Sequence, residues 1–260
     1  MVSPLISRPF KSKVTASREP SQPAPVRLSD YCPARGANVP ACRWGCGIAA
    51  RAFRRLALAG AILPFVRSLV WIRTEGLENL ETLSGPVIFA ATHESELDAL
   101  TILAALPSRW RYRTAVSMAD WVFWRDWFGG PRLQTLRYFA RVALLNGFTL
   151  PPNLAGLRRS LRHMEFLARN GCSILIFPEG AHTPRLLPFQ PGVGWAALHL
   201  GLPVVPIFVK GMGAILPHGA HLARPGRAHV RFGKAIPPAG LDYRVLSAHI
   251  EQQVHALAFE

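Results

Sequence analysis

His93 and Asp98, a base and a carboxylate five positions apart, are the residues whose types and spacing most directly suggest chemistry. Imidazole titrates near neutral pH, which makes His93 a candidate general base. A carboxylate at the second ring nitrogen would fix the tautomer and stabilise the imidazolium that forms when the ring accepts a proton. Asp98 can serve this purpose if the chain turns into a helix directly after His93. The pair therefore predicts a reaction that includes proton abstraction.

The same residues also allow a purely structural interpretation. Ser95-Glu96-Leu97-Asp98 fits a capping box, in which the Asp98 carboxylate merely accepts the backbone N–H of Ser95. The spacing leaves both interpretations open. In either one Ser95 is expected to be a helix N-cap and not a nucleophile, because the sequence contains no Gly-x-Ser-x-Gly elbow of a serine hydrolase.

A second polar motif, Phe177-Pro178-Glu179-Gly180, follows later in the chain. The Glu179 carboxylate could bind a hydroxyl-bearing substrate or hold a turn in place. Gly180 has no side chain, so a ligand can approach its backbone closely. His182 and Arg185 continue the same loop and could meet an anionic group. These four residues are the candidate substrate-binding set.

Both motifs stand directly after apolar runs that read as strands, residues 87–91 and 173–177. In open α/β sheets, ligands bind in the crevice outside the carboxyl ends of the strands. Two polar clusters placed alike therefore predict one shared active site.

Strand-like and helix-like runs alternate from about residue 73 onward, which predicts an α/β domain with helices on the faces of a sheet. The expected strands are residues 87–91, 114–118, 143–150, 173–177, 204–210 and 229–232. The expected helices are residues 96–105, 119–127, 133–142, 154–170, 193–200 and 243–258.

Composition divides the chain into three parts. Residues 1–45 are a basic tail rich in Pro and Ser and are expected to be disordered. Residues 46–75 are expected to form a helical segment, and residues 76–260 the main domain. The apolar run 56–66 is shorter than the roughly twenty residues of a spanning helix, and arginines flank it. This predicts an interfacial membrane anchor; a helix packed on the main domain is the alternative.

A net charge of +15 on a chain that is 50% hydrophobic fits an anionic membrane surface better than a nucleic acid, so no nucleic acid is expected as a partner. Four cysteines do not indicate a disulfide scaffold in a chain of this length, and no spacing suggests a metal site. The N-terminus lacks the apolar core of a secretory signal. We therefore expect membrane association at the cytoplasmic face.

Three ordered blocks resemble the glycerolipid acyltransferase family typified by 1-acylglycerol-3-phosphate acyltransferase. They are His-x4-Asp, Phe-Pro-Glu-Gly and Gly201-Leu202-Pro203-Val204-Val205-Pro206-Ile207. The similarity runs from about residue 72 to residue 234. It implies a mixed, twisted sheet flanked by helices, as in glycerol-3-phosphate acyltransferase.

The resemblance also implies a reaction, the transfer of an acyl chain from a coenzyme A or acyl-carrier-protein thioester to a hydroxyl of a lysophospholipid. By this resemblance His93 deprotonates the acceptor hydroxyl, Asp98 orients His93, and Glu179 and Gly180 belong to the acceptor-binding block. The thioester is a co-substrate, and no cofactor or metal is implied.

Two positions depart from the family pattern. Pro152 and His182 stand where arginines would meet the acceptor's phosphate. Arg158, Arg159 or Arg185 could replace them, or the acceptor is a lipid without that phosphate.

Two other function classes are weighed against the acyltransferase. One is a metal-assisted hydrolase that uses His93, Asp98 and His182. The other is a lipid- or nucleic-acid-binding protein that has lost catalysis. The missing arginines favour this class, and the intact His93–Asp98 pair argues against it.

Overall fold

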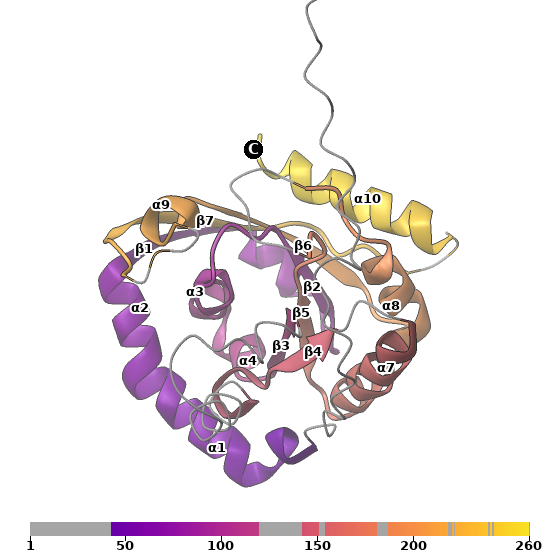
Figure 1. Cartoon of the computed structure of the whole chain (residues 1–260), viewed down its shortest axis with the longest axis horizontal. Coiled ribbons are helices and arrows are strands. Elements are labelled where there is room, and N and C mark those ends of the chain that lie inside the picture. Colours follow the sequence, from indigo (N-terminus) through magenta and orange to yellow (C-terminus); the bar gives the residue numbers. More distant parts are fainter. Residues whose placement is uncertain are drawn as a thin grey trace, which may run out of the picture. The chain divides into compact units, whose positions relative to one another are not determined.

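A seven-stranded mixed sheet in the order β1-β7-β6-β2-β5-β3-β4 forms the centre of the computed structural model (Figure 1). The structure describes residues 43–119, 142–150, 154–180, 187–217, 220, 222–238, 240 and 242–259. The strands are β1 (Val70–Glu75), β2 (Ile88–Ala91), β3 (Thr114–Ala119), β4 (Phe148–Leu150), β5 (Ser173–Ile176), β6 (Val204–Lys210) and β7 (Gly226–Phe232). Strands β2 to β6 run parallel, whereas β7 is antiparallel to β6 and carries β1 parallel to itself.

Helices cover both faces of this sheet (Figure 1). They are α1 (Ile48–Ala57), α2 (Leu63–Leu69), α3 (Asp98–Ala105), α4 (Ser108–Arg111), α7 (Leu154–Arg169), α8 (Gly192–Leu200), α9 (Met212–Ile215) and α10 (Tyr243–Ala256). Local signals set several of their ends. Asp242 caps α10 by accepting the backbone N–H of Arg244 at 2.8 Å. Gly201 ends α8 in the left-handed conformation, at φ 64°, which costs glycine little.

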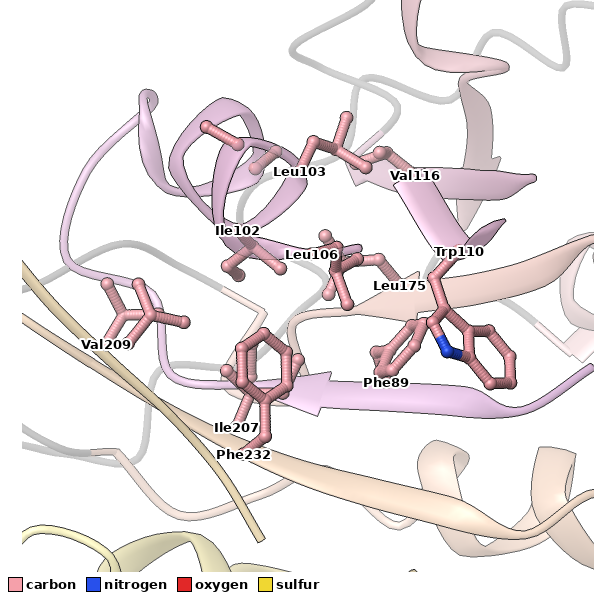
Figure 2. Close-up of a cluster of buried hydrophobic side chains, with 14 of the residues drawn as sticks. Phe89, Ile102, Leu103, Leu106, Trp110, Val116, Leu175, Ile207, Val209 and Phe232 are labelled. Atoms are coloured by element: carbon pink, nitrogen blue, oxygen red, sulfur yellow. The ribbon is translucent and has the colours of Figure 1, made fainter. Parts of the chain in front are cut away.

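Alternating side chains of the sheet feed two hydrophobic cores. In β2, Phe89 and Ala91 belong to the core on the side of α3, while Ile88 and Ala90 belong to the core on the side of α8 and α10. Figure 2 shows Phe89, Ile102 and Phe232 within the α3-side core. Trp110 of α4 packs edge-on against Phe89, with ring centroids 5.8 Å apart. Because both faces of β2 are buried, the loop that follows it starts from a rigid strand.

The expected α/β architecture is confirmed, with two corrections among the strands. Of residues 143–150 only Phe148–Leu150 form a strand, because residues 142–145 are helical. Val70–Glu75, expected as the end of the helical segment 46–75, is strand β1. Its β-branched residues Val70 and Ile72 pack on the α3-side core while Trp71 points away, which is a period-two strand pattern.

Three expectations fall wholly or largely outside the described residues. They are the disordered tail over residues 1–45 and the helices over residues 119–127 and 133–142, since residues 1–42 and 120–141 are not described.

Residues 48–69 form the helical segment that was expected before the domain. Helix α1 passes into α2 through a π-helical stretch, Leu58–Ile62, just before Pro64. Leu58, Leu63 and Val66 are buried in the α3-side core. Within the described residues, no helix combines the length and the apolar character that crossing a membrane requires.

Candidate active site

His93 lies in the short loop between β2 and α3, and Asp98 is the first residue of that helix. The Nδ1 atom of His93 is 2.9 Å from Oδ2 of Asp98. The carboxylate is completely buried, whereas the imidazole keeps 18% of its surface exposed. A carboxylate acceptor at Nδ1 places the ring proton there and the basic lone pair on Nε2.

Asp98 makes the carboxylate contact that each of the two interpretations expected of it. Its Oδ2 atom also accepts the backbone N–H groups of Glu94, at 2.6 Å, and Ser95, at 2.8 Å. One oxygen thus holds the imidazole and closes the loop that carries it. Charge-assisted hydrogen bonds of this kind are the stronger ones, so the carboxylate fixes the position of the loop as well as that of the ring.

Ser95 is not the N-cap that we expected. The N-cap is Leu97, and the Ser95 hydroxyl accepts the N–H of Leu97 at 3.4 Å while donating to the backbone carbonyl of Leu216 at 2.9 Å. The difference arises because Asp98 itself opens the helix, which moves Ser95 two residues before the cap.

The loop is also bound to the end of β6 and to α9 by residues that the sequence analysis did not identify. The Thr92 hydroxyl donates to the carbonyl of Val209 at 3.2 Å and accepts its N–H at 2.9 Å. Glu94 Oε2 accepts the N–H of Gly213 at 3.1 Å, and burial raises the pKa of this carboxyl. No local pattern signals these bonds, because their partners are more than a hundred positions away in the chain.

The second motif meets the first through Glu179 and Phe177. Glu179 Oε1 accepts the backbone N–H of His93 at 3.1 Å, and Oε2 accepts that of Leu187 at 3.2 Å. Glu179 is only 5% exposed, and burial raises its pKa to about 7. The ring of Phe177 stacks on the imidazole of His93, with centroids 4.1 Å apart and planes at 20°. The structure thus places both motifs at one edge of the sheet.

Gly180 supplies the turn after Glu179. It has φ 73°, a conformation that side chains other than glycine rarely adopt, and its N–H donates to the carbonyl of Phe177 at 3.1 Å. The other substrate-binding candidates, His182 and Arg185, lie outside the described residues, as does Pro152. Arg158 and Arg159 belong to α7.

The described part of the chain contains no group of three or more His, Cys, Asp or Glu residues that could hold a metal ion. The hydrolase alternative drew on His182, which is outside that part. The described residues of the two motifs place a histidine–carboxylate pair in a network of backbone amides.

Comparison with known proteins bears directly on this arrangement. The sequence model of the acyltransferase family matches residues 71–210, which include every described residue of both motifs. The chain belongs to the acyltransferase family. The resemblance inferred from the motifs is therefore confirmed.

Similar proteins within this family carry more specific names. The chain is 30% identical over 164 residues to the chloroplastic 1-acyl-sn-glycerol-3-phosphate acyltransferase BAT2 of Brassica napus, which covers 62% of this chain and 42% of that protein. It is 30% identical over 187 residues to the chloroplastic 1-acyl-sn-glycerol-3-phosphate acyltransferase LPAT1 of Arabidopsis thaliana, and this alignment covers 70% of the chain and 47% of LPAT1. This member of the acyltransferase family thus spans about half the length of the curated relatives it matches.

The fold also matches a solved structure, that of the 1-acyl-sn-glycerophosphate (LPA) acyltransferase PlsC from Thermotoga maritima. The TM-score is 0.57 at 23% identity, over 78% of this acyltransferase-family chain and 79% of PlsC. At this identity the likeness concerns the fold, and it supports the expected mixed sheet flanked by helices.

Proposed function

We propose that the protein is an O-acyltransferase that moves a fatty acyl chain from an acyl-CoA or acyl-carrier-protein thioester to a hydroxyl of a lysophospholipid such as 1-acylglycerol-3-phosphate. The observation that carries the proposal is the His93–Asp98 contact of 2.9 Å, made by a wholly buried carboxylate at the carboxyl end of β2. The names of the relatives support the same reaction and a role in lipid metabolism, and we propose that this role is phospholipid biosynthesis.

In the proposed mechanism, Nε2 of His93 takes the proton of the acceptor hydroxyl while the hydroxyl oxygen attacks the thioester carbonyl carbon. The carbonyl π electrons move to oxygen and form a tetrahedral oxyanion. This intermediate collapses by breaking the carbon–sulfur bond, and the leaving thiolate receives the proton from the imidazolium. Asp98 stabilises the imidazolium between these two proton transfers.

The acceptor would lie on the outer side of the Glu179–Gly180 turn. Both carboxylate oxygens of Glu179 already accept backbone N–H groups, so Glu179 would shape this wall. His182 and Arg185 follow two and five residues after Gly180 and would supply positive charge for an acceptor phosphate.

The segment from α1 to α2 would attach the enzyme to an anionic membrane surface, at the cytoplasmic face. Its outward side exposes large apolar residues next to the exposed Arg51, Arg55 and Arg67. These apolar residues are Ile48, Phe53, Leu56 and Phe65. A helix of this composition is typical of one that lies in the headgroup region.

Acyl transfer by the purified protein in lipid vesicles tests the proposal. Labelled acyl-CoA or acyl-carrier protein is offered with lysophosphatidate or with a panel of other lysolipids and hydroxyl lipids. The variant His93→Ala should reduce the rate by about a hundredfold or more, because it removes the general base. His199→Ala removes an exposed histidine at the end of α8 and should leave the rate unchanged.

The panel also separates the possible acceptors. Transfer to lysophosphatidate would mean that other basic groups replace the two missing arginines, and transfer only to another lipid would mark a changed acceptor. If no combination of donor and acceptor supports transfer that depends on His93, the proposal is wrong.

A further inference from the structure

Strands β1, β7 and β6 carry basic side chains in register on one face of the sheet. Arg73 of β1 is paired with His229 of β7, which is paired with Lys210 of β6. Two residues farther along, Trp71 is paired with Arg227. Side chains of paired residues share a face, and alternate residues of a strand return to it. We call this set, Trp71, Arg73, Lys210, Arg227 and His229, the basic sheet face.

Burial of the intervening residues shows which side this face occupies. Val70, Val209, Ala228 and Val230 are at most 2% exposed and lie in the α3-side core. The basic sheet face therefore points to the opposite side, the one on which α10 packs.

Helix α10 covers that side only in part (Figure 1). At Leu257, just past its end, the backbone carbonyl accepts a hydrogen bond from Arg231 at 2.7 Å, and Phe208 nearby is buried. Beyond this point His229 is partly exposed and the other side chains of the face are open to solvent. Trp71 is 65% exposed, the Arg73 side chain 69%, and Lys210 and Arg227 are exposed as well.

The positive charge on this face is largely uncompensated. Glu75 forms ion pairs of 2.7 Å with both Arg73 and Arg231, and Arg231 holds the pKa of that carboxyl below its usual value. The side chains of Lys210, Arg227 and His229, by contrast, make no hydrogen bond or ion pair with any residue that the structure describes. The unpaired cations of Lys210 and Arg227, held on a fixed sheet, create a positive field that attracts acidic surfaces.

The basic sheet face reaches the catalytic edge of the sheet. Lys210 ends β6 and is followed by Gly211, whose φ of 96° turns the chain into α9. In α9, the N–H of Gly213 holds Glu94, the neighbour of His93. Because β7 runs antiparallel to β6, Arg227 lies beyond the end of β6, on the catalytic side.

The area of the face suits an extended acidic surface better than a single phosphate. Three adjacent strands span about 10 Å, and two residues along a strand add about 7 Å. We infer that the basic sheet face is a docking surface for an acidic protein, namely the carrier that presents the acyl thioester to His93. This inference rests on the proposed function and names the donor that it leaves open.

A bilayer is the competing occupant, and the geometry disfavours it. The segment from α1 to α2, whose outward side we propose as the membrane contact, packs on the α3 side of the sheet through Leu63 and Val66. The basic sheet face points the other way, so one planar membrane would not cover both. A soluble carrier can approach the free face while the helix lies on the membrane.

Direct binding tests the inference without relying on catalysis. The probe is an acyl-carrier protein with a fluorophore on its phosphopantetheine thiol, and its Kd for the full chain is measured by anisotropy. The double variant Lys210→Gln/Arg227→Gln should raise the Kd about 2- to 30-fold, the product of two exposed charge interactions. Salt should weaken wild-type binding more steeply than binding of the variant.

The matched control is Arg113→Gln. Arg113 is also exposed, but it lies just before β3, where its carbonyl accepts the N–H of Ser173 at the start of β5, away from strands β1, β7 and β6. It should leave the Kd unchanged. Equal weakening by Arg113→Gln would show that only net charge matters and would overturn the inference.

Two further measurements separate the alternatives. With acyl-CoA as donor, the double variant should keep kcat and KM within about twofold, whereas KM for the acyl-carrier donor should rise with its Kd. An unchanged carrier Kd together with weaker flotation on anionic vesicles would make this face a membrane contact, and the inference would be wrong. If wild type shows no transfer from either donor but binds the carrier through Lys210 and Arg227, the docking surface stands and the proposed function fails.

Discussion

The His93 loop and the helical segment from α1 to α2 are built in opposite ways. The loop forms hydrogen bonds with the carboxylate of Asp98, which directly follows it, and with two distant residues, Glu179 and Val209. The helical segment buries one side in the core. On its outer side, large apolar residues are exposed, such as Leu56 at 75% and Phe65 at 63%. A site that must hold reacting atoms in fixed positions needs several hydrogen bonds to the same loop. A surface that contacts a lipid membrane, as we propose for the helical segment, needs only exposed apolar area.

The strongest way to break this contrast is to disturb the centre of the loop. Asp98→Asn keeps the size of the side chain but removes the charge that holds the imidazole. We expect kcat for acyl transfer to fall by about 10²- to 10⁴-fold, because the ring loses its orientation and its stabilising anion. If kcat stays within tenfold of wild type while the melting temperature falls, Asp98 is only a cap for the helix.

The next largest effect should come from the outer side of the helical segment. Leu56→Ser/Phe65→Ser should lower partitioning onto anionic vesicles by about 100-fold, because each large apolar side chain contributes about 1.5 kcal/mol or more when it leaves water. Vesicle flotation measures the change, and Phe259→Ser, which removes an apolar residue that is 91% exposed near the C-terminus, is the control. Since the altered side chains are exposed, the melting temperature should not change. Unaltered flotation would contradict membrane attachment through this segment.

Glu179→Gln tests the hydrogen bonding of the His93 loop by removing one of the two hydrogen bonds that the Glu179 carboxylate accepts. An amide has one acceptor oxygen, so the N–H of His93 or of Leu187 would face an NH₂ group and lose its partner. An unsatisfied buried group costs about 1–3 kcal/mol, and we expect kcat to fall about 5- to 100-fold. Glu251→Gln is the matched control, because Glu251 accepts one backbone N–H, that of Phe189 at 3.1 Å, away from His93. A loss of activity as large in Glu251→Gln would mean that only stability is affected.

The smallest effect should appear in the pH dependence of stability. Burial raises the pKa of Glu179 from 4.5 to about 7, so between these values the folded protein holds a proton that the unfolded chain has released. This favours the folded state at low pH, and the contribution of Glu179 to stability should be lost as pH rises from about 4.5 to about 7. Burial of Glu94 acts in the same direction, so the difference between wild type and Glu179→Gln isolates the contribution of Glu179. Melting temperatures at pH 5 and pH 8 give this difference, and equal slopes in the two proteins would contradict the prediction.

Much of the architecture was readable from the sequence because it rests on local patterns. Apolar runs of strand length bounded by helices predicted β2, β3, β5, β6 and β7, and the two motifs at strand ends predicted a common edge. The spacing of His93 and Asp98 was compatible with their contact and equally with a bond from Asp98 to the backbone of Ser95, and Asp98 makes both. Strand β1 was missed because its apolar residues continue those of the preceding helix, and only its pairing with β7 shows that the chain has become extended.

Only the tertiary structure shows which distant segments of the chain contact each other. No local pattern indicates that Glu179 accepts the N–H of His93, 86 positions earlier, or that Thr92 binds the end of β6 and Glu94 binds Gly213 of α9. The basic sheet face is likewise invisible in the sequence, because Arg73, Lys210 and Arg227 come together only through the strand order β1-β7-β6. Side-chain periodicity and motif spacing are properties of a few consecutive residues, so they can be read directly from the sequence. Which strand pairs with which depends on the burial of the whole core, and that is settled only when the chain folds.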